Sequence, residues 1–269
     1  MKLNTRKIKA NKVSEGKLPL QMLTCYDFQT AQLFNETEVD MLLVGDSLGN
    51  VILGYETTVE VTLEEMIVFG AAVKRGAPHK FVIVDMPFGT YNTVEDGLKN
   101  ATILFQKTKA EAIKIEASNN INIKLIKRLC EVGIPVMGHI GLTPQSVHEL
   151  GGYYTHGNSD DSAMKLVQQA RALEAAGCFS IVLECVTKNL ATEITNLLDV
   201  PTIGIGAGDK TDGQVLVTND LLRLGPNQPP KFVEPIANLF HLKKQLISNY
   251  LQDKKFNSIE EFNESSIEH

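Results

Sequence analysis

Short apolar runs alternate with longer amphipathic stretches along most of this chain. A run of four or five apolar residues bounded by polar or turn-forming positions is typical of a buried parallel strand, whereas apolar positions every three or four residues predict a helix. The pattern predicts eight strands, at 20–24, 41–46, 81–85, 112–116, 135–139, 180–184, 202–205 and 214–217. Helices are expected between them, at 31–36, 63–75, 94–109, 121–130, 162–176 and 190–198.

Two of these helices have apolar positions regular enough to define a face. In the first, at 63–75, the positions that share a face are Leu63, Met66, Ile67, Gly70 and Ala71. In the second, at 162–176, apolar residues recur at three-residue steps, at Met164, Val167, Ala170, Leu173 and Ala176. Faces of this kind predict helices that pack their apolar side on a sheet.

Eight strands with helices between them indicate an α/β fold, a (β/α)₈ barrel, with a doubly wound open sheet as the alternative. No low-complexity linker or break in composition divides the chain, so residues 1–269 are expected to form a single domain. A closing helix is predicted at 236–250. We expect a poorly ordered, acidic tail from about residue 252.

The composition favours a soluble, cytoplasmic protein with a large core. Of the 269 residues, 43% are hydrophobic, and the net charge of −6 argues against a surface that binds nucleic acid. The four cysteines lack C-x-x-C and zinc-site spacing, so we expect buried thiols in a reducing compartment. No apolar segment approaches the length of a membrane span, and no membrane partner is expected.

Three neighbouring predicted strands end on a carboxylate. The second, third and fourth strands end on Asp46, Asp85 and Glu116, at spacings of 39 and 31 residues. Each spacing suits one βα unit, so the carboxylates should lie at the edge of the sheet where α/β enzymes have their active sites. Converging carboxylates repel one another unless a hard cation such as Mg²⁺ or Ca²⁺ binds them. The pattern favours a divalent-metal site, although each residue taken alone could be a turn former or helix N-cap.

Other polar residues at strand ends are further candidates. Lys114 and Glu116 alternate along one strand and point to the same side, so a buried Lys114 needs an anion, either a neighbouring carboxylate or an anionic substrate. Glu184 ends the sixth strand, where a buried carboxylate away from the metal would be a general base. The alternative for Glu184 is a structural salt bridge. His139 is more typical of a hydrogen-bonded structural group than of a catalyst.

Two loops complete the expected edge of the sheet. The segment Gly151-Gly152-Tyr153, after Thr143-Pro144-Gln145-Ser146, is expected to form a mobile loop over the barrel mouth. The glycines at 204–208 lack the full pattern of a dinucleotide-binding loop, so we expect a tight turn or a close approach of backbone to ligand.

Seven segments in the same order resemble one enzyme family. They are VGDSLGNVILGYETTVEVTLEEM (44–66), VDMPFGTYN (84–92), AIKIEA (112–117), GHIGLTPQSVHELGGY (138–153), VLECV (182–186), VPTIGIGAG (200–208) and TDGQVLV (211–217). The family is 3-methyl-2-oxobutanoate hydroxymethyltransferase, also called ketopantoate hydroxymethyltransferase. The resemblance implies a TIM barrel of the phosphoenolpyruvate/pyruvate superfamily that transfers a one-carbon unit from 5,10-methylenetetrahydrofolate to 3-methyl-2-oxobutanoate. The product is 2-dehydropantoate, on the route to pantothenate and coenzyme A.

The resemblance also implies roles for individual residues. Asp46, Asp85 and Glu116 would hold one Mg²⁺ per subunit. Ser47, Asp85 and Lys114 would bind the keto acid, and Glu184 would be the catalytic residue that moves the proton. The reaction would pass through a Mg-stabilised enolate. A homo-oligomer, commonly a decamer, is implied as well.

The chain departs from the family pattern beside the proposed ligands. Ala117-Ser118 replace two glycines, Asn50 replaces a methionine and Asn219 replaces a histidine, which puts folate fit and rate in question more than reaction type. Two alternative functions stay open. One is a related metal-dependent carbon–carbon lyase, which usually has a catalytic cysteine loop that we do not find. The other is a non-catalytic barrel retained as a binding or assembly subunit.

Overall fold

The structure is a computed structural model that describes residues 3–12, 18–117 and 119–253. It contains two compact units, Met1–Val217 and Thr218–His269, where the sequence predicted one domain. In the part of the chain that is described, no helix is long and apolar enough to cross a membrane.

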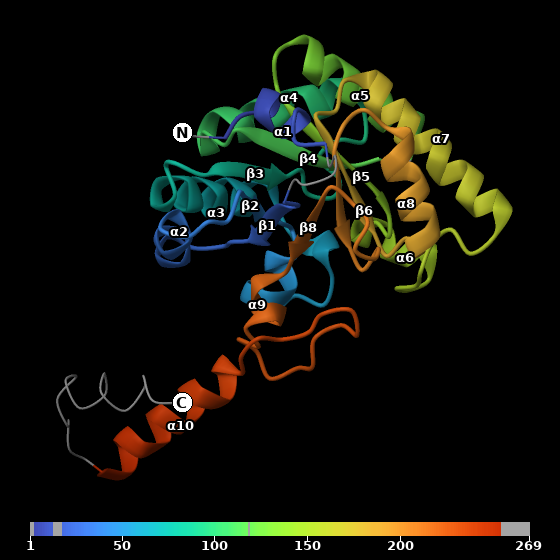
Figure 1. Cartoon of the computed structure of the whole chain (residues 1–269). Coiled ribbons are helices and arrows are strands. Elements are labelled where there is room, and N and C mark those ends of the chain that lie inside the picture. Colours follow the sequence, from blue (N-terminus) through green and yellow to red (C-terminus); the bar gives the residue numbers. More distant parts are fainter. Residues whose placement is uncertain (1–2, 13–17, 118, 254–269) are drawn as a thin grey trace. The chain divides into compact units, whose positions relative to one another are not determined.

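The first unit is a closed barrel of parallel strands (Figure 1). Its strands are β1 (Leu20–Thr24), β2 (Met41–Val44), β3 (Phe81–Asp85), β4 (Ala112–Glu116), β5 (Val136–Gly141), β6 (Ser180–Glu184), β7 (Thr202–Ile205) and β8 (Gly213–Leu216). Each strand pairs with the next, and β8 pairs with β1 to close the barrel. This closure confirms the predicted (β/α)₈ barrel over the open sheet.

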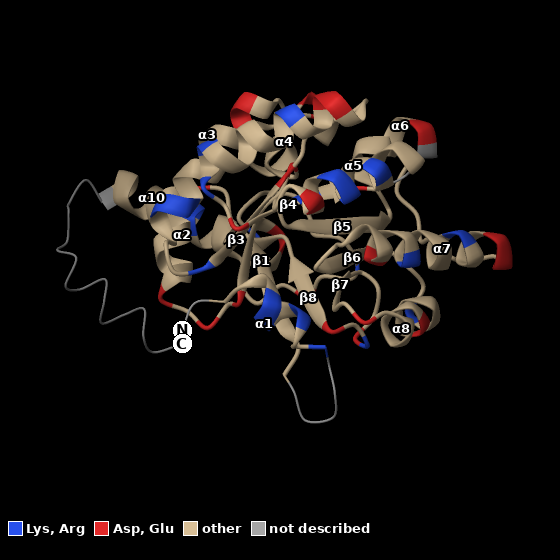
Figure 2. Ribbon diagram, turned by 90° about the horizontal axis from the view of Figure 1, so that it is seen from above, with Lys and Arg blue, Asp and Glu red and all other residues tan. Residues whose placement is uncertain are grey.

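Helices surround the barrel. They are α2 (Phe28–Asn35), α3 (Leu63–Gly76), α4 (Val94–Thr108), α5 (Asn120–Glu131), α6 (Val147–Leu150), α7 (Asp160–Ala176) and α8 (Lys188–Leu197). Short turns of π-helix and 3₁₀-helix lie at Gly49–Leu53, Thr58–Glu60 and Pro144–Ser146. Polar side chains cap α3, α4, α5 and α7 at Thr62, Thr93, Asn119 and Ser159. Charged residues of both signs lie on the outer helices (Figure 2).

Alternation along the strands divides the apolar core into two layers. On β4, Ile113 and Ile115 belong to the cluster between the strands and the helices, whereas Ala112 belongs to a second cluster inside the barrel. Lys114 and Glu116 share the inward side with Ala112, because successive side chains of a strand point to opposite faces. Apolar residues therefore fill the barrel toward the amino ends of its strands, and polar residues occupy the carboxyl ends.

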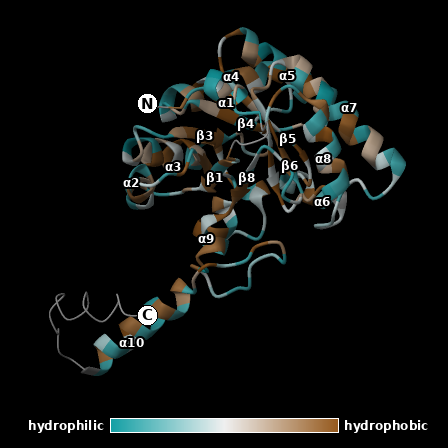
Figure 3. Cartoon of the chain, in the orientation of Figure 1, coloured by the Kyte–Doolittle hydropathy of each residue, from teal (hydrophilic) through white to brown (hydrophobic). Residues whose placement is uncertain are grey.

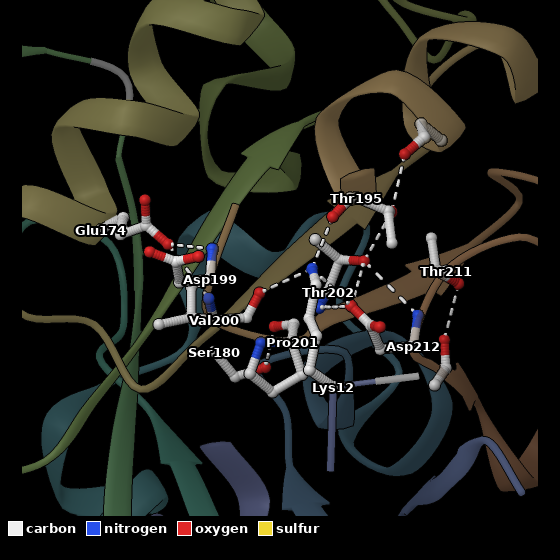
Figure 4. Close-up of polar contacts among 12 residues, drawn as sticks. Lys12, Glu174, Ser180, Thr195, Asp199, Val200, Pro201, Thr202, Thr211 and Asp212 are labelled. Atoms are coloured by element: carbon white, nitrogen blue, oxygen red, sulfur yellow. Dashed lines mark hydrogen bonds and ion pairs between the residues drawn. The ribbon is translucent and has the colours of Figure 1, made fainter. Parts of the chain in front are cut away.

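The N-terminal segment closes the other end of the barrel. The helix α1 (Thr5–Lys9) buries Ile8 completely in the inner cluster. Beyond it, the Lys12 Nζ donates to the carbonyl oxygens of Thr195 and Val200 and lies 3.1 Å from the Asp212 Oδ2 (Figure 4). The same Asp212 oxygen accepts from the Thr202 backbone N–H at 2.8 Å. These contacts tie the chain start to the beginnings of β7 and β8.

The four cysteines are free thiols. Cys25 and Cys178 are buried as predicted, whereas Cys130 and Cys185 are only partly buried. Burial raises the pKa of Cys25 to about 12. Its thiol is therefore protonated at neutral pH.

The second unit contains α9 (Thr218–Leu221) and α10 (Leu239–Asp253). Backbone N–H groups of Ile236 and Leu239 donate to the carbonyls of Leu221 and Leu222, which connects the two segments. The predicted closing helix at 236–250 corresponds to α10. Most of the predicted tail, from 254 to 269, lies outside the described residues.

Candidate active site

The carboxyl ends of the strands bound one cavity of about 140 Å³. Strand register brings its polar residues together, because Asp85 pairs with Lys114 and Glu116 pairs with His139 across neighbouring strands. The lining includes every site residue predicted from the sequence: Asp46, Ser47, Asp85, Lys114, Glu116 and Glu184, together with His139 and Tyr153. Chain segments up to 138 residues apart thus meet at the position where barrel enzymes bind substrates.

The buried Lys114 is paired with Asp85. Its Nζ lies 2.8 Å from the Asp85 Oδ2, and both side chains are almost wholly buried. Burial alone would lower the pKa of Lys114, but the carboxylates of Asp85, Asp46 and Glu116 reverse the effect and raise it. Lys114 is therefore a permanent cation at the cavity floor, and the predicted need for an anionic neighbour is met by a carboxylate of the protein.

The three predicted metal-ligating carboxylates are buried and crowded. Burial first, and then the charge of Asp85, raise the pKa of Asp46 to about 7. Burial and the charge of Asp46 raise the pKa of Glu116. Lys114 supplies positive charge to both groups, but three ionised carboxylates around it would leave the site with excess negative charge. Excess negative charge in a buried oxygen-rich site is the condition that a hard divalent cation relieves.

Oxygen atoms suited to such a cation are present. The Asp85 Oδ1 and the Glu116 Oε1 are buried and have no hydrogen-bond partner. Over the described residues, however, no three acidic, histidine or cysteine side chains already converge closely enough to form a complete metal site. The donor set thus fits a hard cation in chemistry, with carboxylate oxygens left uncommitted.

A glutamine that the sequence did not single out joins two of these carboxylates. The Gln145 Nε2 donates to the Asp46 Oδ2 at 2.8 Å and to the Met86 carbonyl at 2.9 Å. Its backbone N–H donates to the Glu116 Oε2 at 3.2 Å, and its Oε1 accepts from the Tyr91 hydroxyl. Gln145 and Tyr91 are both within resembling segments, but an uncharged amide carries no sequence signal for a role at a charged site.

His139 lies between two glutamates. Its Nε2 is 3.1 Å from the Glu184 Oε2, and its Nδ1 is 3.7 Å from the Glu116 Oε1, with neither pair aligned as a hydrogen bond. Burial and the positive charge of Lys114 lower the pKa of His139. The imidazole is therefore neutral at pH 7, and it contacts the predicted base directly. The Glu184 side chain is 19% exposed and thus only partly buried.

The backbone around Glu184 is tightly constrained. Cys185 has a positive φ of 49°, which few non-glycine residues adopt, and its N–H donates to the Ile205 carbonyl at 2.9 Å. The Glu184 carbonyl accepts from Leu142 N–H at 2.8 Å. A side chain at Gly141 would place its Cβ 2.2 Å from this carbonyl oxygen, so only glycine fits there. Strands β5 and β6 therefore fix the position from which the Glu184 side chain extends.

The remaining predicted residues also contact the cavity. The Ser47 hydroxyl is 2.8 Å from the hydroxyl of buried Tyr26, which sequence analysis did not identify. Tyr153, from the predicted loop over the mouth, is 61% exposed and lines the cavity. Among the departures from the family pattern, Asn50 lines the cavity and donates to two loop carbonyls, and Ser118 lies outside the described residues.

Comparison with known proteins gives consistent results. The sequence model described as ketopantoate hydroxymethyltransferase matches residues 2–258. A Geobacillus protein named 3-methyl-2-oxobutanoate hydroxymethyltransferase is 46% identical to this chain, over 93% of this chain and 90% of that protein. A protein of the same name from Thermosipho africanus is 47% identical, over 91% of this chain and 94% of that protein.

Solved structures with low sequence identity share the barrel. A phosphoenolpyruvate phosphomutase from Streptomyces platensis has a TM-score of 0.67 at 12% identity, covering 96% of this chain and 91% of that protein. A 2,3-dimethylmalate lyase of the PEP mutase/isocitrate lyase superfamily has a TM-score of 0.61 at 14% identity, covering 95% and 90%. These similarities confirm the predicted fold type.

Proposed function

Because the chain belongs to the ketopantoate hydroxymethyltransferase family, we propose that it is an enzyme that transfers a hydroxymethyl group from 5,10-methylenetetrahydrofolate to 3-methyl-2-oxobutanoate. The product would be 2-dehydropantoate, a precursor of pantothenate. The observation that carries the proposal is the convergence of Lys114, Glu184 and three carboxylates on one cavity at the carboxyl end of the barrel. The lyase alternative shares only the fold with this chain.

Polar groups on the cavity wall suit an anionic keto acid. The substrate carboxylate would pair with the Lys114 ammonium, and the Ser47 hydroxyl would donate a hydrogen bond to the keto acid. The ammonium has three N–H donors, so it would bind the substrate carboxylate while keeping its contact with the Asp85 Oδ2.

The proposed metal is one Mg²⁺ per subunit. Asp46, Asp85 and Glu116 would hold it, because their crowding and the uncommitted oxygens of the last two fit a hard cation. When bound, the ion supplies positive charge that stabilises negative charge developing on the keto oxygen. A structure of the same fold, phosphonopyruvate hydrolase, was determined with oxalate and Mg²⁺.

Glu184 is the proposed proton-transfer residue. Its carboxylate would accept the hydrogen from C3 of the keto acid, leaving an enolate whose C3 attacks the methylene carbon of the folate. Water then supplies the hydroxyl oxygen as tetrahydrofolate leaves. Neutral His139, in contact with the Glu184 Oε2, limits the orientations of this carboxylate.

We also place the enzyme in the cytoplasm, as four free thiols suit a reducing compartment.

A direct assay tests the proposal. The purified chain, mixed with 3-methyl-2-oxobutanoate and 5,10-methylenetetrahydrofolate, should form 2-dehydropantoate, detected by mass spectrometry. EDTA should abolish formation and added Mg²⁺ should restore it, because the crowded carboxylates require a cation. Omitting the folate is the control. Folded, Mg²⁺-supplied protein that forms no product would contradict the transferase assignment, and full turnover in EDTA would contradict the metal.

A further inference from the structure

Each of the three crowded carboxylates has one oxygen held by the protein. The Asp85 Oδ2 accepts from the Lys114 Nζ at 2.8 Å and the Asp46 backbone N–H at 3.2 Å. Asp46 and Glu116 are each held through one oxygen by Gln145, by its side chain and by its backbone respectively. The second oxygens of Asp85 and Glu116 have no partner. One oxygen of each of these two groups is thus fixed while the other stays available.

Gln145 is itself held in a single orientation. Its amide nitrogen faces two acceptors, the Asp46 carboxylate and the Met86 carbonyl, while its amide oxygen faces the Tyr91 hydroxyl. Reversing the amide would place its oxygen against two other oxygens and lose both hydrogen bonds. Gln145 is 5% exposed and Tyr91 is 9% exposed, so water does not readily replace these partners. A buried amide with both ends satisfied is a rigid support.

The amide also has the right charge for this position. A lysine or arginine at residue 145 would neutralise Asp46 and compete with a cation, whereas an amide fixes the carboxylate and leaves its negative charge in place. The 3₁₀ turn Pro144–Ser146 supports the same residue from the backbone side, because it directs the Gln145 N–H at Glu116. One residue therefore sets the relative position of two carboxylates that come from different strands.

Resting on the proposed Mg²⁺ site, we propose that Gln145, supported by Tyr91, is a positioning residue that orients Asp46 and Glu116 for a divalent cation. Residues that hydrogen-bond to metal ligands fix the ligand geometry, and their loss typically lowers metal affinity by about 10–100-fold. Gln145 acts through the carboxylates and needs no contact with the substrate. Its primary effect should therefore be on metal binding.

The test measures binding of Mn²⁺ alone, by electron paramagnetic resonance, to the full chain. Gln145→Leu keeps the size of the side chain but leaves Asp46 without its donor, so affinity should fall by about 10–100-fold. Tyr91→Phe leaves Gln145 in place and removes one hydrogen bond, so affinity should fall by about 3–10-fold. Tyr55→Phe, which removes a hydroxyl bonded to Glu65 instead, is the matched control and should bind as the parent does.

Thermal unfolding separates positioning from folding. The proposal is supported if Gln145→Leu or Tyr91→Phe binds Mn²⁺ more weakly than the parent while its melting temperature matches that of Tyr55→Phe. If Gln145→Leu does not fold, Tyr91→Phe provides the test. Unchanged affinity in folded Gln145→Leu or Tyr91→Phe overturns the positioning role alone. A parent protein that binds no Mn²⁺ overturns the metal site and this proposal together. The two failures are therefore distinguishable.

Discussion

At the scale of single residues, the site depends on carboxylates that differ in their neighbours. Asp85 has one oxygen on Lys114 and one without a partner, so in the proposed site this side chain would contact both the Lys114 ammonium and the metal. Neutral His139 lies between Glu184 and Glu116, with one ring nitrogen toward each. In the proposed mechanism, Glu184 would accept the proton while Asp46, Asp85 and Glu116 would hold the cation.

The proposed base is tested by Glu184→Gln. The amide is nearly isosteric, so folding and metal binding should persist, while kcat should fall by about 10²–10⁴-fold because proton transfer is lost. Deuterium exchange at C3 of 3-methyl-2-oxobutanoate, measured without folate, isolates this step. Glu131→Gln, an exposed glutamate on α5, is the control and should exchange like the parent. If Glu184→Gln exchanges deuterium as fast as the parent, Glu184 is not the group that removes the C3 proton.

At the scale of elements, the strands could be predicted from sequence almost to the residue. Apolar runs flanked by turn-forming residues mark buried parallel strands well, and five of the observed strands, including β3 and β4, have the predicted bounds. β5 extends to Gly141, beyond the predicted end at His139, because Gly141 pairs with Glu184 on β6. Such pairing depends on a neighbour distant in sequence, which a local pattern does not reveal.

Helix faces were harder to predict. The three-residue steps in α7 place Met164 on the apolar face, but Met164 is 57% exposed and Leu166 is buried instead. Three residues turn an α-helix by about 300°, so a strict three-residue repeat rotates off one face within a few steps. In α3 the predicted Met66 and Gly70 are buried, together with Val73, which was not assigned to the face.

Some residues of the candidate site could be predicted from the sequence and others could not. Charged residues at strand ends were predictable because burying a charge requires a chemical reason. Gln145, Tyr91 and Tyr26 were not, because neutral polar side chains are common in loops and acquire their roles only through contacts made by folding. The helix α1 was missed for a related reason: a basic segment with one buried residue, Ile8, has too little periodicity to predict a helix.

The contacts of Lys12 predict a stability effect without a catalytic one. Lys12→Met should lower the free energy of unfolding by about 2 kcal/mol, because the buried Asp212 carboxylate loses a charged donor. The kcat of folded protein should not change, since these contacts lie at the end of the barrel opposite the cavity. Urea unfolding and initial rates measure the two quantities. Lys9→Met, an exposed position in α1, is the control. A changed kcat in fully folded Lys12→Met, or an unchanged free energy of unfolding, would contradict this account.

At the scale of the whole molecule, α10 exposes several apolar side chains beside its polar ones. None of its side chains that are described is buried, and its exposed apolar residues are Phe240, Leu242, Ile247, Tyr250 and Leu251. Hydrophobic residues recur along the helix in Figure 3. A polar helix surface would suit a free monomer, whereas an exposed apolar patch is typical of an interaction site. We therefore expect α10 to pack against another copy of this chain, in the homo-oligomer implied by the family resemblance.

Light scattering after size-exclusion chromatography tests this assembly. The parent should have a mass well above the 29.6 kDa of one chain. Leu242→Glu combined with Ile247→Glu should lower the mass, because burying two carboxylates without partners in an apolar interface costs several kcal/mol. Gln245→Glu with Asn249→Glu adds the same charge to the same helix at polar positions, so any loss of assembly there would reflect charge alone. A parent that elutes as a monomer at working concentrations contradicts the homo-oligomer. A parent oligomer that persists in the Leu242 and Ile247 variant instead places the interface on another surface.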